Sequence, residues 1–307
     1  MSLTILGNEI IVYTGSVFLA VGIFGNIGNI YIFSRLSTYR RTSCIFYYLI
    51  ASMCNLHVML FQLIPSVATS SYNFDVSRTS NIWCKIRTYF TTSITPISFT
   101  CVCLATIDQF FATSRNDHIR RFSNIKMAYR CAGITTLFWL IHGIFGAVFY
   151  SNASGWCTPT NAIVNTYSTI YVTAVVCLIP GIVQGIFGWL VYRNLCQTII
   201  LAREHADRQA TRMVLMEVLL VLISISPYGA NSIYRLATTN VQKDADQLTK
   251  EYFVITMVTL MTYVYFIVRF SNSFHHHLSF SFREVFIYLF SHRLAFVNQF
   301  EDKYFGG

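Results

Sequence analysis

Ionisable side chains are scarce in this chain, so those inside apolar stretches are the first candidates for chemistry. Glu217 and Arg269 each lie within a long apolar run, and three consecutive histidines, 275–277, follow the arginine. Neighbouring side chains on a helix point in different directions, so these histidines cannot hold one metal ion together. No CxxC pair occurs, and no nucleophile, acid and base gather at one depth. The sequence therefore predicts no metal site, no cofactor and no enzyme.

The composition points to lipid as the surrounding solvent. Hydrophobic residues make up 54% of the chain and charged residues only 11%, whereas soluble proteins carry about a quarter of their residues as charged ones. The formal charge of +9 comes from short basic clusters between apolar runs, not from one basic face, so nucleic acid is not an expected partner. No linker or low-complexity tract divides residues 1–307, and we expect a single domain.

The elements that must position these residues are membrane-spanning helices, each needing about 20 mainly apolar residues. The chain predicts an all-α membrane protein, a seven-helix bundle with spans at Ile10–Phe33, Cys44–Thr69, Ile86–Thr113, Met127–Tyr150, Ile163–Tyr192, Met213–Ala237 and Tyr252–His277. A further run, Phe282–Phe290, has apolar residues at helical spacing but is too short to span. It predicts an amphipathic helix on the cytoplasmic surface.

The positions of Lys and Arg set the expected orientation, because basic loops stay in the cytoplasm. The loops after the first, third and fifth spans and the C-terminal tail are rich in arginine, and the opposite loops hold few basic residues. We therefore expect a plasma-membrane protein with its N-terminus outside and its C-terminus inside. The sequon at Asn152 falls on the outer side and is a glycosylation candidate.

This topology also predicts a disulfide. Most of the cysteines lie inside spans or at the cytoplasmic edge, which leaves Cys84 and Cys157 in the oxidising compartment. Free extracellular cysteines are a liability, so these two are expected to pair.

Several residues in order along the chain carry a family resemblance. Seven spans, a cysteine at the outer start of the third and another after the fourth resemble the rhodopsin-like (class A) G-protein-coupled receptors. Further matches are Gly25-Asn26, Trp139, Pro180, Pro227 and Phe282-Arg283. The segment around Asp108 stands where that family has Asp-Arg-Tyr, and it is similar to divergent invertebrate receptors grouped with neuropeptide receptors. The resemblance implies a receptor for an extracellular ligand that signals through a heterotrimeric G protein.

The chain also departs from that family at functional positions. Asn55 replaces the sodium-binding Asp, Gln109 replaces the Arg after Asp108, and Pro227 lacks the usual Cys-Trp before it. The Asn-Pro-x-x-Tyr motif is degenerate, with His275 or His277 in place of its tyrosine. The alternatives are a seven-span protein that binds a ligand or partner without G-protein signalling and, less favoured, a small-molecule transporter, since the prolines show no repeat symmetry.

Polar residues in the cytoplasmic half are candidates for activation and coupling. A charged group inside a span costs roughly 2.5–3.5 kcal/mol on insertion scales, so Glu217 and Arg269 call for a partner or a water-filled cavity. One interpretation is a cluster with the histidines; the other is that Arg269 and the histidines reach to the inner interface. Pro227 is either a hinge or a fixed kink. The full set is Asn26, Asn55, Asp108, Gln109, Glu217, Pro227, Arg269, Asn272 and His275.

Aromatic and polar residues in the outer half are candidates for a ligand pocket. They are Tyr89, Thr91, Thr92, Thr95, Asn231, Tyr234, Arg235, Tyr263 and Tyr265; half of them could instead serve helix packing. The family's amine-binding Asp and retinal-binding Lys are replaced by what look like Thr91 and Tyr265. A peptide, or another neutral or anionic ligand, is therefore expected.

Overall fold

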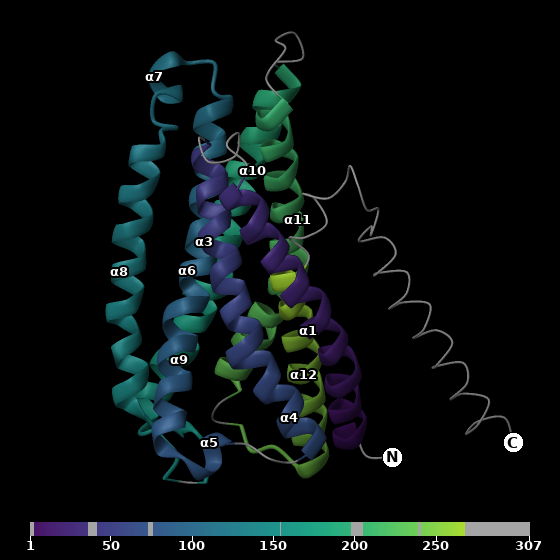
Figure 1. Cartoon of the computed structure of the whole chain (residues 1–307). Helices are drawn as coiled ribbons and strands as arrows, with labels where there is room; N and C mark the ends of the chain where they lie inside the picture. Colours follow the sequence, from purple (N-terminus) through teal and green to yellow (C-terminus); the bar gives the residue numbers. More distant parts are fainter. Residues whose placement is uncertain are drawn as a thin grey trace, which may run out of the picture.

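The computed structural model describes residues 3–35, 42–72, 76–153, 155–197, 205–238 and 241–267. Long helices run side by side along one axis, with the short helices α5 (Val76–Thr79) and α7 (Asp117–Arg120) at opposite ends (Figure 1). The long elements are α1 (Leu3–Arg35), α3 (Ser43–Val58) with η1 (Met59–Leu63) and α4 (Ile64–Tyr72), α6 (Asn81–Thr113), α8 (Ile125–Phe149), α9 (Ala162–Tyr171) with η2 (Val172–Leu178) and α10 (Ile179–Gln197), α11 (His205–Ala237) and α12 (Ala245–Ile267).

Six of the described helices are long and apolar enough to cross a membrane. They cover Leu3–Arg35, Ser43–Tyr72, Asn81–Thr113, Ile125–Phe149, Ala162–Asn194 and Val214–Ala237, which match the first six predicted spans. The prediction of an all-α membrane protein is therefore confirmed. The seventh predicted span begins within α12, and its remainder lies outside the described residues, as do Arg269, Asn272, His275, His277 and the predicted surface helix 282–290.

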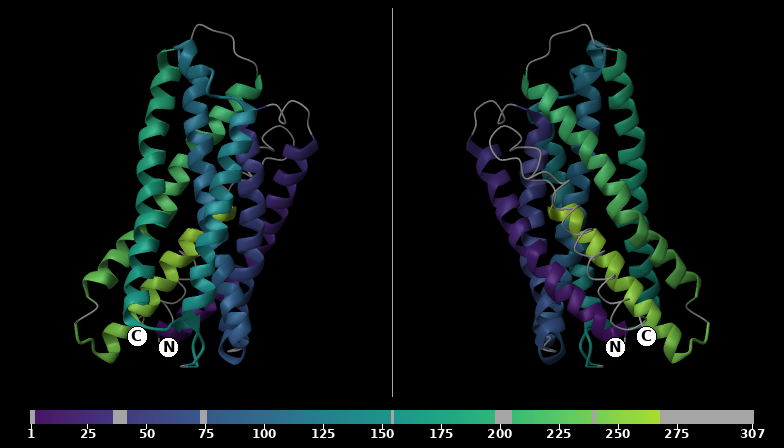
Figure 2. Two further views of the ribbon diagram at one scale, coloured as in Figure 1. Left: turned by 90° about the vertical axis from the view of Figure 1, so that its left-hand side faces the viewer. Right: turned by 90° about the vertical axis from the view of Figure 1, so that its right-hand side faces the viewer.

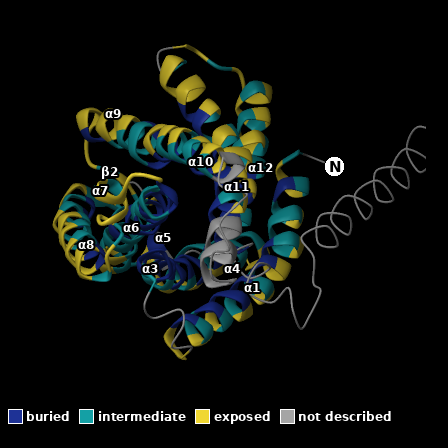
Figure 3. Cartoon of the chain, turned by 90° about the horizontal axis from the view of Figure 1, so that it is seen from above, coloured by how far each residue is buried: buried dark blue, intermediate teal, exposed yellow. Residues whose placement is uncertain are grey.

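The helices α3 and α6 form the centre of the bundle. Within their most apolar windows α3–α4 and α6 each bury 56% of their residues, whereas α8 buries 17%. Seen from the end, α8 exposes most of its outer surface and packs on α6 (Figure 3). Two side views show the α11–α12 connection at the same end as the N-terminus (Figure 2). Because α6 contacts α3, α8, α10 and α11, its residues are well placed to reach a shared interior.

Two prolines explain where the helices widen. Proline lacks an amide proton and its ring clashes with the carbonyl four residues earlier, which disturbs the α-helical ladder. The π-helix η1 ends two residues before Pro65, and η2 ends two residues before Pro180. One-turn π segments relieve this type of conflict and are frequent at functional sites.

Two glycines let α8 approach α6 closely. A Cβ atom added at Gly143 would lie 1.7 Å from Ser93 Oγ and 3.1 Å from the Tyr89 carbonyl oxygen. One added at Gly146 would lie 2.7 Å from Thr92 Oγ1. Small residues permit this kind of backbone approach between membrane helices, where hydrophobic burial gives no driving force.

A small β-hairpin follows α8, and the sequence did not predict it. Strand β1 (Tyr150–Ser151) pairs antiparallel with β2 (Thr158–Pro159), so that Tyr150 lies opposite Pro159. Tyr150, expected as the last residue of the fourth span, is therefore a strand residue. Gly155, in the turn, has a φ of +77°, a conformation that glycine adopts without strain.

Candidate functional site

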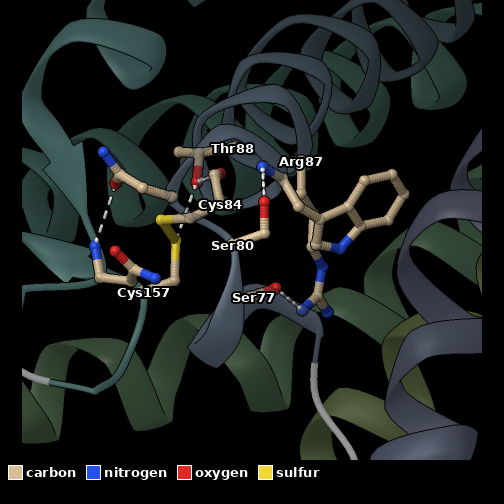
Figure 4. The surroundings of a disulfide bond; sticks show 9 residues. Ser77, Ser80, Cys84, Arg87, Thr88 and Cys157 are labelled. Atoms are coloured by element: carbon tan, nitrogen blue, oxygen red, sulfur yellow. Dashed lines mark hydrogen bonds between the residues drawn. A yellow bond between two sulfur atoms is a disulfide. The ribbon is translucent and has the colours of Figure 1, made fainter.

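The predicted disulfide is present and ties the hairpin to the start of α6. Cys84 and Cys157 are joined, with their Cα atoms 5.6 Å apart (Figure 4). The Thr88 hydroxyl donates to the Cys84 carbonyl oxygen at 2.9 Å and lies 3.6 Å from the Cys157 sulfur. Ser80 caps α6 by accepting a hydrogen bond from the Trp83 amide at 3.3 Å. The hairpin is thereby held across the end of α6.

A cavity of about 390 Å³ opens next to this disulfide. It is bounded by η1, α6, α8, the hairpin, α9, η2, α11 and α12, and so takes walls from most of the bundle. Its volume falls in the usual range for small-molecule sites, about 300–1,000 Å³. The cavity is therefore the candidate ligand site.

The lining changes in polarity along the cavity. Near the disulfide lie Arg87, Thr88, Tyr150 and Ser168, of which Arg87 is charged. Farther along α6 the lining becomes apolar, and it includes Pro96, Phe99, Val176, Tyr228 and Phe266. From Arg87 to Phe99 the helix rises about 18 Å, at about 1.5 Å per residue. One end of the cavity thus has a mainly polar lining, and the other end has a mainly apolar and aromatic lining.

Hydrogen bonds between aromatic and polar side chains fix the walls. His142 Nε2 lies 2.8 Å from the Tyr167 hydroxyl, and its ring stacks on Tyr171 with centroids 4.6 Å apart. The Tyr171 hydroxyl donates to the Thr92 carbonyl oxygen at 3.1 Å. Across the cavity, Gln62 Nε2 donates to Thr95 Oγ1 at 3.1 Å. These contacts connect α8, α9 and η1 to α6, so the cavity is largely preformed.

Only part of the predicted pocket set lines the cavity. Thr91, Thr92, Thr95 and Tyr263 do. Five others lie elsewhere in the fold: Tyr89, Asn231, Tyr234, Arg235 and Tyr265.

Helical register explains this division. On α6 the lining follows a stripe through residues 87, 88, 91, 92, 95, 96 and 99, and Tyr89 falls about 200° away from Arg87. Tyr265 is offset from Tyr263 in the same way. It is fully buried, and its ring stacks on Phe99 with centroids 4.7 Å apart. Tyr265 is therefore a packing residue behind the cavity wall.

The sequence also missed cavity residues, including Arg87, His142, Tyr167, Tyr171 and Tyr228. A signal existed for Arg87, because it precedes Thr91 by four residues and so shares its helix face. His142 and Tyr167 gave no such signal. They meet only through the tertiary approach of α8 and α9.

Tyr234 belongs to a polar cluster at the α11–α12 connection. Its hydroxyl donates to Glu251 Oε1 at 2.9 Å, and Lys243 Nζ lies 2.7 Å from Glu251 Oε2. The hydrogen bond from Lys243 lowers the pKa of the Glu251 carboxyl below its usual value. The cluster joins the ends of two helices at the disulfide end of the bundle.

Buried amides form the polar interior of the bundle. Asn26 Nδ2 donates to the carbonyl oxygens of Gly22, at 2.8 Å, and Phe266, at 3.0 Å, and the second bond ties α1 to α12. The Ser98 hydroxyl donates to Asn55 Oδ1 at 2.6 Å. A neutral amide, Asn55, is therefore buried between α3 and α6.

Asp108 and Gln109 lie near the end of α6 that is opposite to the disulfide. Both are buried, with exposures of 7% and 2%. Thr113 Oγ1 donates to the Gln109 carbonyl oxygen at 2.9 Å and accepts from Asn194 Nδ2 at 3.2 Å, which connects α6 to α10. Glu217 of α11 is also buried, at 4% exposure. Its predicted cluster with Arg269 and His275 stays a prediction, because those residues lie outside the described part of the chain.

Comparison with known proteins does not identify a family for this chain. No protein-family model matches the chain, and no curated protein matches it either. The fold class is therefore an all-α membrane protein with a preformed cavity, and its function has to be argued from its own residues.

Proposed function

We propose that the chain is a seven-span plasma-membrane receptor that binds an extracellular ligand in the cavity beside the disulfide and signals through a heterotrimeric G protein. The observation that carries the proposal is the cavity of about 390 Å³, walled by helices from most of the bundle and bordered by a disulfide-held hairpin. Several helices share this cavity, so a ligand there would contact all of them at once.

The distribution of charge supports the orientation. Arg115, Arg120, Arg121 and Lys126 surround α7, at the end of the bundle opposite to the disulfide. Basic residues favour the cytoplasm and disulfides favour the oxidising side. With this orientation the cavity faces outward, and the basic α7 end faces the acidic lipid surface and the G protein.

A route from the cavity to the inner end runs through α11. Tyr228 lines the cavity and follows Pro227 directly. A Cβ atom added at Gly229 would lie 2.9 Å from Cys177 Cβ, so α11 packs tightly on η2 at the same level. A ligand that displaces Tyr228 would act on the proline, where the helix lacks one hydrogen bond. This arrangement favours Pro227 as a hinge.

The main alternative is a seven-span protein that binds its ligand without G-protein signalling. Gln109 favours it, because glutamine has neither the charge nor the bidentate geometry of the arginine that contacts the G protein in the resembled family. Gln109 is nevertheless buried inside the helix bundle. There its amide can act through neutral hydrogen bonds as an uncharged form of the same switch.

Gln109→Arg distinguishes these alternatives. If position 109 belongs to a switch, we expect the arginine to change basal G-protein turnover or coupling efficiency in reconstituted membranes, since it adds a buried charge beside Asp108. Gln242→Arg makes the same replacement at an exposed site in the α11–α12 connection, at the end of the bundle opposite to α7, and serves as the control. Turnover equal to the wild type at equal surface expression would remove Gln109 from the switch and support the non-signalling alternative.

A further inference from the structure

A second, smaller pocket lies between α1, η1, α4 and α12, with a volume of about 130 Å³; we call it the side pocket. Helix α1 packs on both α4 and α12 around it (Figure 1). The side pocket and the cavity share two lining residues, Thr259 and Tyr263 of α12. These residues are four apart and so lie on one face of the helix. The two spaces therefore meet at one strip of α12.

The register of α12 places this strip at the boundary between the two spaces. Thr262 and Phe266 line the cavity alone, and Thr256 and Leu260 line the side pocket alone. At about 100° per residue, these two pairs face directions about 120° apart, and the shared strip faces midway between them. Tyr263 has an exposure of only 7%. Its side chain is therefore packed between the cavity and the side pocket.

Close contacts of α1 lie on both sides of the side pocket. Ile11 lines the pocket, and glycines lie four residues before and after it. A Cβ atom added at Gly7 would lie 3.6 Å from Phe253 Cδ2, and one added at Gly15 would lie 2.7 Å from Val67 Cγ2. Helix α1 is thus held against α12 on one side of Ile11 and against α4 on the other. This arrangement favours access from the cavity over access from the lipid.

The lining of the side pocket favours an apolar group. Leucine and isoleucine make up half of its lining residues. The hydroxyls of Ser66 and Thr256 donate to the backbone carbonyl oxygens of Gln62 and Tyr252, each at 2.8 Å, so their protons are already used. An apolar cavity of about 150 Å³ in a protein core stays dry and binds benzene. The side pocket therefore suits an apolar group of similar or smaller size.

We propose that the side pocket is a second compartment of the ligand site, which takes a small apolar group of the ligand such as a branched alkyl side chain. In this arrangement Tyr263 is a specificity-determining residue, because its side chain limits how large that group can be. The inference rests on the proposed function, since it assumes that the ligand occupies the cavity. A ligand in the cavity would lie against Thr259 and Tyr263 and would extend past them.

Thiol–disulfide exchange at position 259 tests whether a small apolar group enters the side pocket. Thr259→Cys changes the side-chain size little and places a thiol at the boundary. The full chain in lipid nanodiscs is equilibrated with the disulfides of isopentanethiol and mercaptoethanol, at a thiol concentration that leaves the Cys84–Cys157 bond intact. Peptide-resolved mass spectrometry gives the ratio of the two adducts. Met261→Cys, on the exposed face of α12, gives the ratio that the lipid alone produces.

We expect the isopentyl adduct to be favoured about tenfold more at position 259 than at position 261, because many small dispersion contacts add up in a fitted pocket. Thr256→Phe fills the side pocket and should remove this preference. Val254→Phe adds the same ring on the exposed face of α12 and should not. If Thr256→Phe does not fold, Ser66→Leu fills the pocket from α4 instead.

Tyr263→Ala tests the size limit with a larger naphthylmethyl thiol. While Tyr263 is present, Thr256→Phe should not change the share of naphthylmethyl adduct at position 259. In the Tyr263→Ala chain, Thr256→Phe should lower that share about fivefold, because the naphthyl group then extends into a space that the new ring occupies. Tyr263→Phe keeps the ring and should behave as the wild type.

The inference is overturned if positions 259 and 261 give equal ratios, or if filling the side pocket leaves the isopentyl preference unchanged. Tyr263 is not the size limit if its replacement by alanine leaves the naphthylmethyl adduct insensitive to Thr256→Phe. The assay contains no G protein, so these outcomes are independent of signalling. A chain that shows these preferences but never activates a G protein contradicts the proposed function alone.

Discussion

Replacing Cys84 by serine is expected to lower surface expression strongly and to reduce the free energy of unfolding by about 2–4 kcal/mol. The bond closes a loop with a sequence separation of 73 residues, and constraint of the unfolded chain grows with loop length. The bond also holds the hairpin across the end of α6, beside Thr88 and the cavity. Cell-surface labelling and thermal unfolding of the purified protein measure the two effects.

The double variant Cys84→Ser/Cys157→Ser should be no worse than either single variant, because the same bond is lost once. Cys131→Ser, at a half-buried free cysteine of α8, is the control and should resemble the wild type. Normal trafficking and unchanged thermal stability of Cys84→Ser would show that the disulfide has no structural role.

Gly143→Leu is expected to separate α8 from α6, with a cost of about 1–3 kcal/mol or more from overpacking. The added Cβ would meet the Ser93 side chain and the Tyr89 carbonyl oxygen, which cannot move without its helix. His142, the preceding residue, would also lose its position in the cavity wall. Thermal unfolding and ligand binding should both be impaired.

Gly133→Leu on the same helix provides a matched control, because an added Cβ there meets nothing within 4 Å. It should leave both measurements unchanged. For the milder Gly143→Ala, the Ser93→Ala change should recover part of the stability, since it removes the closest clashing atom. Equal behaviour of Gly143→Leu and Gly133→Leu would refute the close packing of α6 and α8.

The helices and the disulfide could be predicted because each depends on a strong local signal. Apolar runs located the first six spans, and basic clusters combined with cysteine positions identified Cys84 and Cys157. The hairpin could not be predicted, because its two-residue strands carry no periodicity and depend on the disulfide nearby. Pro65 and Pro180 account for the two π-helical segments. The sequence alone does not show which of two adjacent helical turns near each proline becomes π-helical.

The cavity lining was predicted only in part. The position of a residue along a membrane-spanning helix is easier to infer from the sequence than the face of the helix on which its side chain lies. Thr91, Thr92 and Thr95 lie on one stripe of α6, whereas Tyr89 is at the same depth on another face. His142 and Tyr167 are 25 residues apart and meet through helix packing. Such contacts depend on how closely α8 packs in the bundle, and Gly143 and Gly146 allow its close approach to α6. A short stretch of sequence does not reveal this packing.

Ligand-dependent nucleotide exchange on a purified heterotrimeric G protein, in membranes reconstituted with the full chain, tests the receptor proposal most directly. A library of secreted peptides would be applied to the wild type. We predict that at least one ligand raises the exchange rate, and that Cys84→Ser weakens the response. Ligands that bind the chain in nanodiscs but leave the exchange rate unchanged at every concentration would contradict the proposal and identify a binding protein without G-protein signalling.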